Sequence, residues 1–288
     1  MTIVVGALVP SMATSLTASA ATAHRDRGPH YYLALGDSLS VGVEADVPTD
    51  RGYVDRVYSV LRQRDPSLQL RKLGCGGEST DSMIVGDPWL ECTYGSSAHP
   101  IPSQLAAAIE FLRTHRGKVD LITLNIGAND LVQANCQGNT DCVNWVRGRI
   151  RQSLRFILWS LRSVAPEVRI VAMDIYNPVL GAWFMGPDGQ AAALQADAGL
   201  RAINEELRAV YTDFRIPVAP VGAAFSSYDL TTVIDVPGYG SVPLGAARAC
   251  QWTLFCEGQG NFHPNDEGYR VIGDTVLATV DQGRPLRR

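Results

Sequence analysis

The sequence predicts an α/β protein with one parallel sheet of five strands covered by helices. Five short apolar runs alternate along the 288 residues with longer segments in which apolar residues recur at helical spacing. The runs are apolar throughout rather than at every second position, which is typical of strands buried on both faces of a parallel sheet. No internal repeat or linker divides the chain, so we expect a single domain over residues 24–288.

These patterns place the strands and helices in order. The expected strands are residues 31–35, 68–73, 121–126, 168–175 and 218–223. Helical spacing marks residues 53–61, 105–112, 143–161 and 200–214, and a last helix is expected from Pro264, a residue suited to a first helical turn. Right-handed crossovers bring the carboxyl ends of parallel strands to one edge, where open α/β sheets bind ligands. Residues that directly follow the strands are therefore the candidates for chemistry.

Composition and charge narrow the class of protein. A hydrophobic fraction of 46% with 19% charged residues is ordinary for a packed globular chain. A net charge of −4 gives no basic field to attract nucleic acid, so no nucleic-acid partner is expected. Beyond the first residues no apolar run approaches the ~20 residues that a membrane-spanning helix needs. We expect a monomer without stable membrane insertion.

The first residues resemble an export signal. Residues 3–9 are apolar, residues 11–23 are rich in Ala, Ser and Thr, and charge begins abruptly at His24. This order predicts a secretory signal peptide over residues 1–23 and a secreted protein, although no Lys or Arg precedes the apolar run. The alternative is a disordered leader rich in Ala and Ser.

Six cysteines fit an oxidising compartment. They fall as three pairs of close neighbours, Cys75/Cys92, Cys136/Cys142 and Cys250/Cys256. Six cysteines allow fifteen pairings, among which sequence alone does not choose, and pairing of neighbours is the simplest proposal. No CxxC is present and no His lies at ligand spacing from a Cys, so disulfides are favoured over a metal site. No metal or cofactor is expected.

Four polar segments stand where the predicted strands end or the last helix begins. They are Gly36-Asp37-Ser38-Leu39, Gly74-Cys75-Gly76-Gly77-Glu78, Gly127-Ala128-Asn129-Asp130 and Asn261-Phe262-His263-Pro264. At one edge of a sheet they bring together a hydroxyl, a glycine turn, an amide and an imidazole. A serine hydroxyl becomes an effective nucleophile when an imidazole accepts its proton, and fixed N–H donors stabilise the oxyanion that forms.

Together these segments resemble the four sequence blocks of the GDSL, or SGNH, hydrolase family, over about residues 31–280. The resemblance implies a flavodoxin-like three-layer α/β/α sandwich, the SGNH hydrolase fold. It implies Ser38 as nucleophile and His263 as base. It also implies an oxyanion hole formed by the Ser38 N–H, the Gly77 N–H and the Asn129 side chain, with Gly76 as the neighbouring candidate for the second donor.

One position departs from the family pattern. The family usually has an Asp three residues before its histidine, and this chain has Gly260 there. Our first hypothesis is a Ser–His dyad in which the Gly260 backbone carbonyl orients the imidazole of His263. Glu257 is the alternative third member. Asp37 and Asp130 are interpreted as structural residues that tie loops to backbone N–H groups.

Apolar residues near this edge favour an acyl ester as substrate. Residues 178–187 follow the fourth strand and form an apolar segment that we interpret as a loop, and Met83, Ile84, Val85 and Trp89 could supply another wall. The sequence therefore predicts a secreted lipase or carboxylesterase. The apolar residues could instead close the core. A carbohydrate acetylesterase and a non-catalytic secreted binding domain are the remaining alternatives.

Overall fold

The computed structural model describes residues 28–44, 47–258 and 261–283. The signal peptide expected over residues 1–23 lies outside the described residues. Within them no helix combines the length and the apolar character needed to cross a bilayer.

A five-stranded parallel sheet forms the centre of the fold, as predicted. Its strand order is β4 (Leu68–Lys72), β1 (His30–Gly36), β7 (Val119–Asn125), β8 (Arg169–Met173) and β9 (Val218–Ala219). The inner strands β1 and β7 are buried over most of their length because helices cover both faces. The edge strand β4 instead alternates buried and exposed residues, which the apolar-run criterion did not anticipate.

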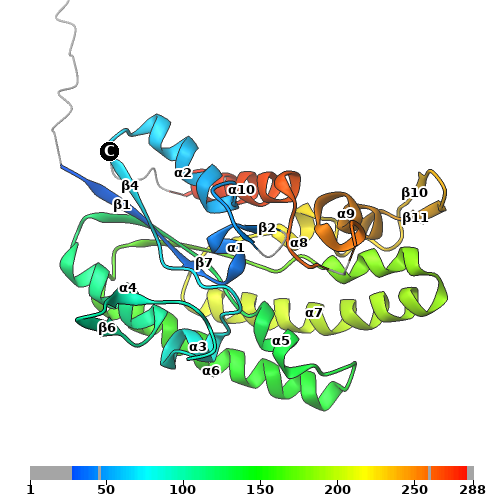
Figure 1. Ribbon diagram of the computed structural model, residues 1–288, viewed down its shortest axis with the longest axis horizontal. Helices are drawn as coiled ribbons and strands as arrows, with labels where there is room; N and C mark the ends of the chain where they lie inside the picture. Colours follow the sequence, from blue (N-terminus) through cyan, green and yellow to red (C-terminus); the bar gives the residue numbers. More distant parts are fainter. Residues whose placement is uncertain (1–27, 45–46, 259–260, 284–288) are drawn as a thin grey trace, which may run out of the picture.

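Two layers of helices enclose the sheet (Figure 1). The helices α2 (Tyr53–Arg64) and α10 (Asp266–Asp281) cover one face, where Tyr32 and Ala34 of β1 point. On the opposite face lie α4 (Gln104–Thr114), α6 (Thr140–Val164) and α7 (Pro187–Asp213), packed on Leu33 and Leu35. Successive residues of one strand thus serve two separate cores, and the predicted α/β/α sandwich is confirmed.

Shorter elements complete the chain. They are α1 (Ser38–Val41), β2 (Val43–Glu44), β3 (Val47–Pro48), α3 (Thr80–Val85), β5 (Tyr94–Ser96), β6 (His99–Ile101), α5 (Ala128–Ala134), the 3₁₀ helix η1 (Pro178–Met185), α8 (Val221–Ala224), β10 (Val233–Val236), β11 (Gly240–Pro243), α9 (Leu244–Trp252) and the 3₁₀ helix η2 (Leu254–Cys256). The antiparallel hairpins β5–β6 and β10–β11 lie outside the main sheet and were not predicted.

Three differences from the predicted elements have a clear local cause. The strand expected over residues 218–223 ends at Ala219, because Pro220 has no N–H to donate and a short helix follows it. Residues 178–187, interpreted as a loop, form η1 and run directly into α7, which therefore starts well before residue 200. The last helix starts at Asp266 rather than Pro264, because the Asn265 side chain caps it by accepting the Gly268 N–H.

Three disulfides link neighbouring cysteines. The structure joins Cys75 to Cys92, Cys136 to Cys142 and Cys250 to Cys256, with Cα–Cα distances of 5.9, 5.4 and 5.1 Å. The first closes the loop that follows β4, and the last lies on the segment that leads to His263. Two of the three disulfides therefore constrain the segments that carry Gly77 and His263.

Candidate active site

Ser38 and His263 meet at the carboxyl edge of the sheet although they are far apart in sequence. Ser38 starts the short helix α1 directly after β1, and His263 lies just before α10. The Ser38 Oγ is 2.9 Å from the His263 Nε2, and both residues are half-buried. This is the distance at which an imidazole can take a proton from a hydroxyl.

Buried side chains hold Ser38 at the end of β1. The Asp37 Oδ1 accepts hydrogen bonds from the Leu39 N–H at 3.0 Å and from the Asn125 Nδ2 at 2.6 Å. The Asn125 Oδ1 in turn accepts from the Tyr53 hydroxyl at 2.8 Å. Gly36 has a φ of +137°, and a Cβ there would lie 2.1 Å from the Asn125 carbonyl oxygen. Only glycine allows β1 to turn this sharply into Ser38.

Asp37 carries a shifted pKa that follows from its position. Burial raises the pKa of Asp37 to about 7, against the hydrogen bonds from Leu39 and Asn125, which lower it. Asp130 is a second buried carboxyl, which accepts from the Thr80 N–H at 2.9 Å and the Thr80 hydroxyl at 2.5 Å. Both aspartates tie loops to their neighbours, which fits the structural role interpreted from the sequence.

The glycine pair after β4 forms a tight turn. The Glu78 N–H donates to the Cys75 carbonyl at 3.3 Å, and Gly77 has a φ of +78° in the third position, as in a type II turn. A Cβ on Gly77 would lie 2.9 Å from Leu90 Cδ2, whereas a Cβ on Gly76 would meet only open space. The turn therefore requires glycine at position 77 and not at position 76.

Asn129 is bonded directly to this turn. Its Nδ2 donates to the Glu78 carbonyl at 2.9 Å, so the start of α5 and the glycine turn are fixed to each other. The Gln133 Nε2, one helical turn further, donates to the Gly77 carbonyl at 2.8 Å. Asn129 lines the same cavity as Ser38 and His263, whereas Gly77 is not among the described residues that line it.

A buried network that sequence reasoning missed connects the turn to the nucleophile strand. The Gln104 Oε1 accepts from the Gly36 N–H at 2.7 Å, and its Nε2 donates to the Gly36 carbonyl and the Glu78 carboxylate, both at 2.9 Å. Burial raises the pKa of Glu78, which also accepts from Ser82 and Tyr94. Gln104 stands at the start of an apolar helix, and nothing in the sequence distinguishes it from a surface residue.

The imidazole of His263 contacts a side chain that was not among the candidates from the sequence. The Asn261 Oδ1 accepts the His263 backbone N–H at 2.9 Å and lies 2.9 Å from the His263 Nδ1. Because a backbone N–H only donates, the amide must present its oxygen, so the Nδ1 carries the hydrogen and the Nε2 accepts from Ser38. An Asn side chain often accepts the backbone N–H of the residue two positions further on, in an Asx-turn. The spacing of Asn261 and His263 fits this pattern and could have identified Asn261.

The two orienting groups proposed from the sequence have different outcomes. Gly260 lies outside the described residues. Glu257 is exposed and lines the cavity, but among the described interactions none joins its carboxylate to the imidazole. The rest of the segment is held by the Tyr176 hydroxyl, which donates to the Phe262 carbonyl at 2.7 Å, and by the Leu254 N–H, which donates to the His263 carbonyl at 2.9 Å.

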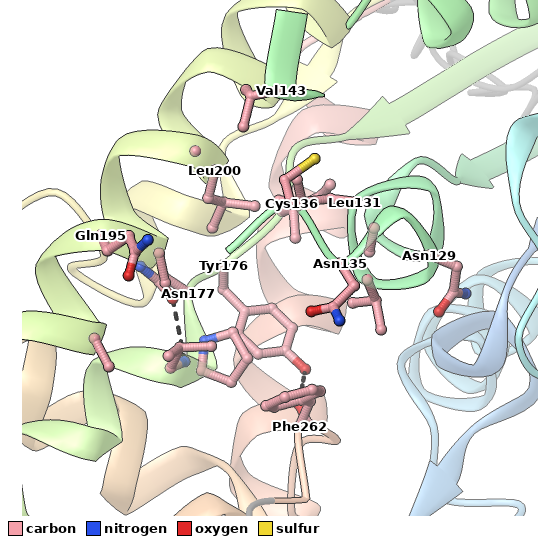
Figure 2. Close-up of a pocket in the computed structure, with 18 of the residues that line it drawn as sticks. Asn129, Leu131, Asn135, Cys136, Val143, Tyr176, Asn177, Gln195, Leu200 and Phe262 are labelled. Atoms are coloured by element: carbon pink, nitrogen blue, oxygen red, sulfur yellow. Dashed lines mark hydrogen bonds between the residues drawn. The ribbon is translucent and has the colours of Figure 1, made fainter. Parts of the chain in front are cut away.

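Ser38 and His263 open into a cavity of about 1200 Å³. Its walls come from α5, the start of α6, α7 and the segment after β8. Leu131, Val143 and Leu200 gather at one end, and Phe262 lies at the other (Figure 2). Polar side chains such as Asn135 and Gln195 lie among them. The nucleophile therefore faces a large cavity of mixed but mainly apolar character.

The sequence model of the GDSL-like Lipase/Acylhydrolase family matches residues 34–271. The chain belongs to this family. It is an ester hydrolase, as predicted.

Solved structures share the fold of this GDSL-like hydrolase at low sequence identity. A lipase from a goat rumen metagenome matches with a TM-score of 0.54 and 18% identity, covering 88% of this chain and 99% of that one. An extracellular lipase from Streptomyces rimosus matches with 0.53 and 17%, covering 87% and 99%. A phospholipase A1 from Streptomyces albidoflavus matches with 0.52 and 15%, covering 88% and 99%. A comparison with curated proteins gives no match.

The residues that line the cavity of this GDSL-like hydrolase differ from those expected to form an acyl-binding groove. Met83 is fully buried in the core, Val85 and Trp89 are exposed, Ile84 packs on the core, and none of them lines the cavity. Of residues 178–187 only Pro178 and Val179 reach it, because η1 turns Leu180 into a small apolar core that it forms with Ala193, Ala246 and Ala249. The cavity walls come mainly from α5 and α7 instead.

Proposed function

We propose that this GDSL-like hydrolase is a secreted lipase or carboxylesterase that cleaves acyl esters through an acyl-enzyme on Ser38. The observation that carries the proposal is the 2.9 Å contact between Ser38 Oγ and His263 Nε2 at the wall of a mainly apolar cavity. The Oγ attacks the ester carbonyl carbon while Nε2 takes its proton. The imidazolium then protonates the leaving alcohol, and water, activated by the same Nε2, releases the acid and restores Ser38.

Three N–H donors are proposed for the oxyanion: the backbone N–H groups of Ser38 and Gly77 and the Asn129 side chain. The type II turn supports Gly77, because its N–H belongs to the central peptide and is not used by the bond that closes the turn. One Asn129 amide hydrogen is donated to the Glu78 carbonyl, and we assign the second to the oxyanion. Loss of one such donor typically lowers kcat by ~10²–10³.

For the third member we propose Asn261. Its carboxamide oxygen is 2.9 Å from Nδ1, whereas the Glu257 carboxylate makes no described contact with the ring. An amide fixes the tautomer and the orientation of the imidazole without adding a negative charge. Asn261 is thus a positioning residue, and the pair that reacts is Ser38 and His263.

The cavity supports an acyl chain longer than acetyl. A volume of about 1200 Å³ with Leu131, Val143 and Leu200 along the wall provides apolar surface that an acetyl group would not use. This favours a lipase or esterase over a carbohydrate acetylesterase. Secretion is supported by the three disulfides, since such bonds persist in oxidising compartments.

The test is an ester chain-length profile with labelling of the nucleophile. We expect octanoyl p-nitrophenyl ester to be cleaved with a higher kcat/KM than the acetyl ester, and Ser38→Ala and His263→Ala to lose at least ~10³-fold. A serine-directed phosphonate should label Ser38 of the wild type. Equal labelling of Ser38→Ala contradicts the nucleophile, and a clear preference for acetyl supports the acetylesterase instead. Ser67→Ala, at an exposed serine remote from the site, serves as the matched control.

A further inference from the structure

A second cavity, of about 530 Å³, lies outside the site described above. It is enclosed by the end of η1, the β10–β11 hairpin, α9 and η2. Its lining side chains are apolar apart from Gln251 and the Tyr239 hydroxyl, and they include Phe184, Met185, Ile234, Val236 and Phe255. A cavity of this size and composition can hold a flexible apolar group.

Its rim exposes large apolar side chains to solvent. Met185 is 69% exposed, Tyr239 62% and Ile234 39%. The Phe184 and Tyr239 rings meet edge to face at 4.8 Å, so the hairpin is packed onto η1 rather than standing free. A group of exposed apolar residues around an apolar cavity is typical of a binding site.

The two cavities are back to back across the segment that precedes His263. Gly258 lines both of them. Phe255 lines the second cavity and Phe262 lines the first, and their rings are stacked with centroids 6.0 Å apart. Leu254 likewise lines the first cavity and Cys256 the second. Phe255, Gly258 and Phe262 thus lie between the second cavity and the site of Ser38 and His263.

We propose that the second cavity binds the second acyl chain of a two-chain ester whose scissile ester lies at Ser38. This inference rests on the function proposed above. In a two-chain ester the acyl chains are joined to neighbouring carbons. If one chain lies in the large cavity, the second chain starts close to the reacting ester and can run past Phe262 and Gly258, which line that cavity. The second cavity offers apolar surface within reach of that point, and burial of an acyl chain there favours a diacyl lipid over a single-chain ester.

The hairpin supplies a matched pair of variants. Ile234 lines the cavity, while its neighbour Val233 does not and is 59% exposed. Because successive strand residues point to opposite faces, Ile234→Asp puts a charge at the cavity and Val233→Asp puts the same charge on the other face. Ala247→Phe is a second test, since Ala247 lines the cavity from α9 and a larger side chain reduces its volume.

The experiment compares p-nitrophenyl octanoate with 1,2-dihexanoylglycerol, each kept in monomeric solution. We expect Ile234→Asp and Ala247→Phe to raise the KM for the two-chain ester about tenfold, the equivalent of losing roughly two buried methylene groups, and to leave the KM for octanoate within about twofold. Val233→Asp should change neither value. Unchanged thermal melting shows that the variants are folded.

Three results with the variants would overturn the inference. They are equal effects of Ile234→Asp and Val233→Asp, equal effects on both esters, and a defect that appears only when the substrate is aggregated, which would indicate contact with a lipid surface instead. A wild-type protein that cleaves octanoate but not the two-chain ester also contradicts it. A wild-type protein that cleaves neither ester contradicts the proposed function itself, so the two failures can be told apart.

Discussion

The two halves of the candidate site are built in different ways. Ser38 directly follows β1, an inner strand of the sheet, and the side chains that hold it, Asp37, Asn125 and Gln104, are all buried. His263 stands on a segment outside the sheet, where Phe262 is exposed and Asn261 is half-buried. The segment is held by a few contacts, among them the Tyr176–Phe262 hydrogen bond and the Cys250–Cys256 disulfide.

Because of this difference, we expect substitutions near Ser38 to lower the stability of the protein and substitutions near His263 to lower its activity. A buried polar group left without its partner costs roughly 1–3 kcal/mol, so damage around Ser38 should unfold the protein. A partner lost near the surface can be replaced by water, so damage around His263 should misplace the base and leave the fold intact. The predictions below test this separation, beginning with the largest effect.

Gln104→Ala should destabilise the protein by about 2–4 kcal/mol, because it removes the described partner of the buried Gly36 N–H and one hydrogen bond each from the Gly36 carbonyl and the Glu78 carboxyl. The measurement is the free energy of unfolding from urea titration. Gln133→Ala is the matched control, since Gln133 is exposed and makes one hydrogen bond, to the Gly77 carbonyl. It should cost less than about 1 kcal/mol. Similar losses in the two variants would contradict the comparison.

Asp37 should make stability fall as pH rises. Its pKa is raised to about 7 in the folded protein and is ~3.9 in an unfolded chain, so between these values the folded state holds a proton that the unfolded state has lost. Its contribution is therefore fully present below about pH 4 and lost by about pH 7, with a slope of up to ~1.4 kcal/mol per pH unit.

Asp37→Asn cannot titrate and should flatten this slope, measured as the urea midpoint between pH 4 and pH 8. Some slope should remain, because burial also raises the pKa of Glu78 and Asp130. The control Asp235→Asn, at an exposed carboxylate of the β10–β11 hairpin, should keep the wild-type slope. An unchanged slope in Asp37→Asn would show that Asp37 is not buried as a neutral acid.

Sequence patterns predicted the parts of this molecule that depend on local periodicity and on the order of motifs. The parallel sheet followed from apolar runs, and the meeting of Ser38 with His263 followed from their places at strand and helix ends. The fifth strand was overextended because Pro220 ends it, and η1 was interpreted as a loop from its glycines and prolines.

The supports of the site could not be predicted, since they depend on which distant residues the fold brings together. Gln104 and Gly36 are 68 positions apart, and Gln104 does not differ in sequence from an exposed glutamine such as Gln133. The prediction of which residues line the cavity was wrong for the same reason. Apolar residues near the edge, such as Met83, point into the core, and composition alone does not give their direction.

Asn261 provides the smallest expected effect and the sharpest test of the His263 side. Asn261→Ala removes the acceptor for Nδ1, and a hydrogen bond worth roughly 1 kcal/mol corresponds to a loss on the order of five- to tenfold in kcat. The free energy of unfolding should stay within about 0.5 kcal/mol of wild type, because Asn261 is not buried. Glu257→Gln, which lines the same cavity without touching the ring, is the control and should retain wild-type kcat.

Asn261→Asp distinguishes orientation of the ring from general packing. It should restore the acceptor, so kcat recovers, and it adds a negative charge beside the imidazole. That charge favours the protonated form of His263, which cannot act as a base. The fall in activity at acidic pH should therefore begin at a higher pH in Asn261→Asp than in the wild type. If Asn261→Ala keeps full activity while Glu257→Gln loses it, the carboxylate orients the base and the role proposed for Asn261 is wrong. If Asn261→Ala instead lowers stability and activity together, the base depends on the fold as closely as Ser38 does, and the two halves of the site do not differ.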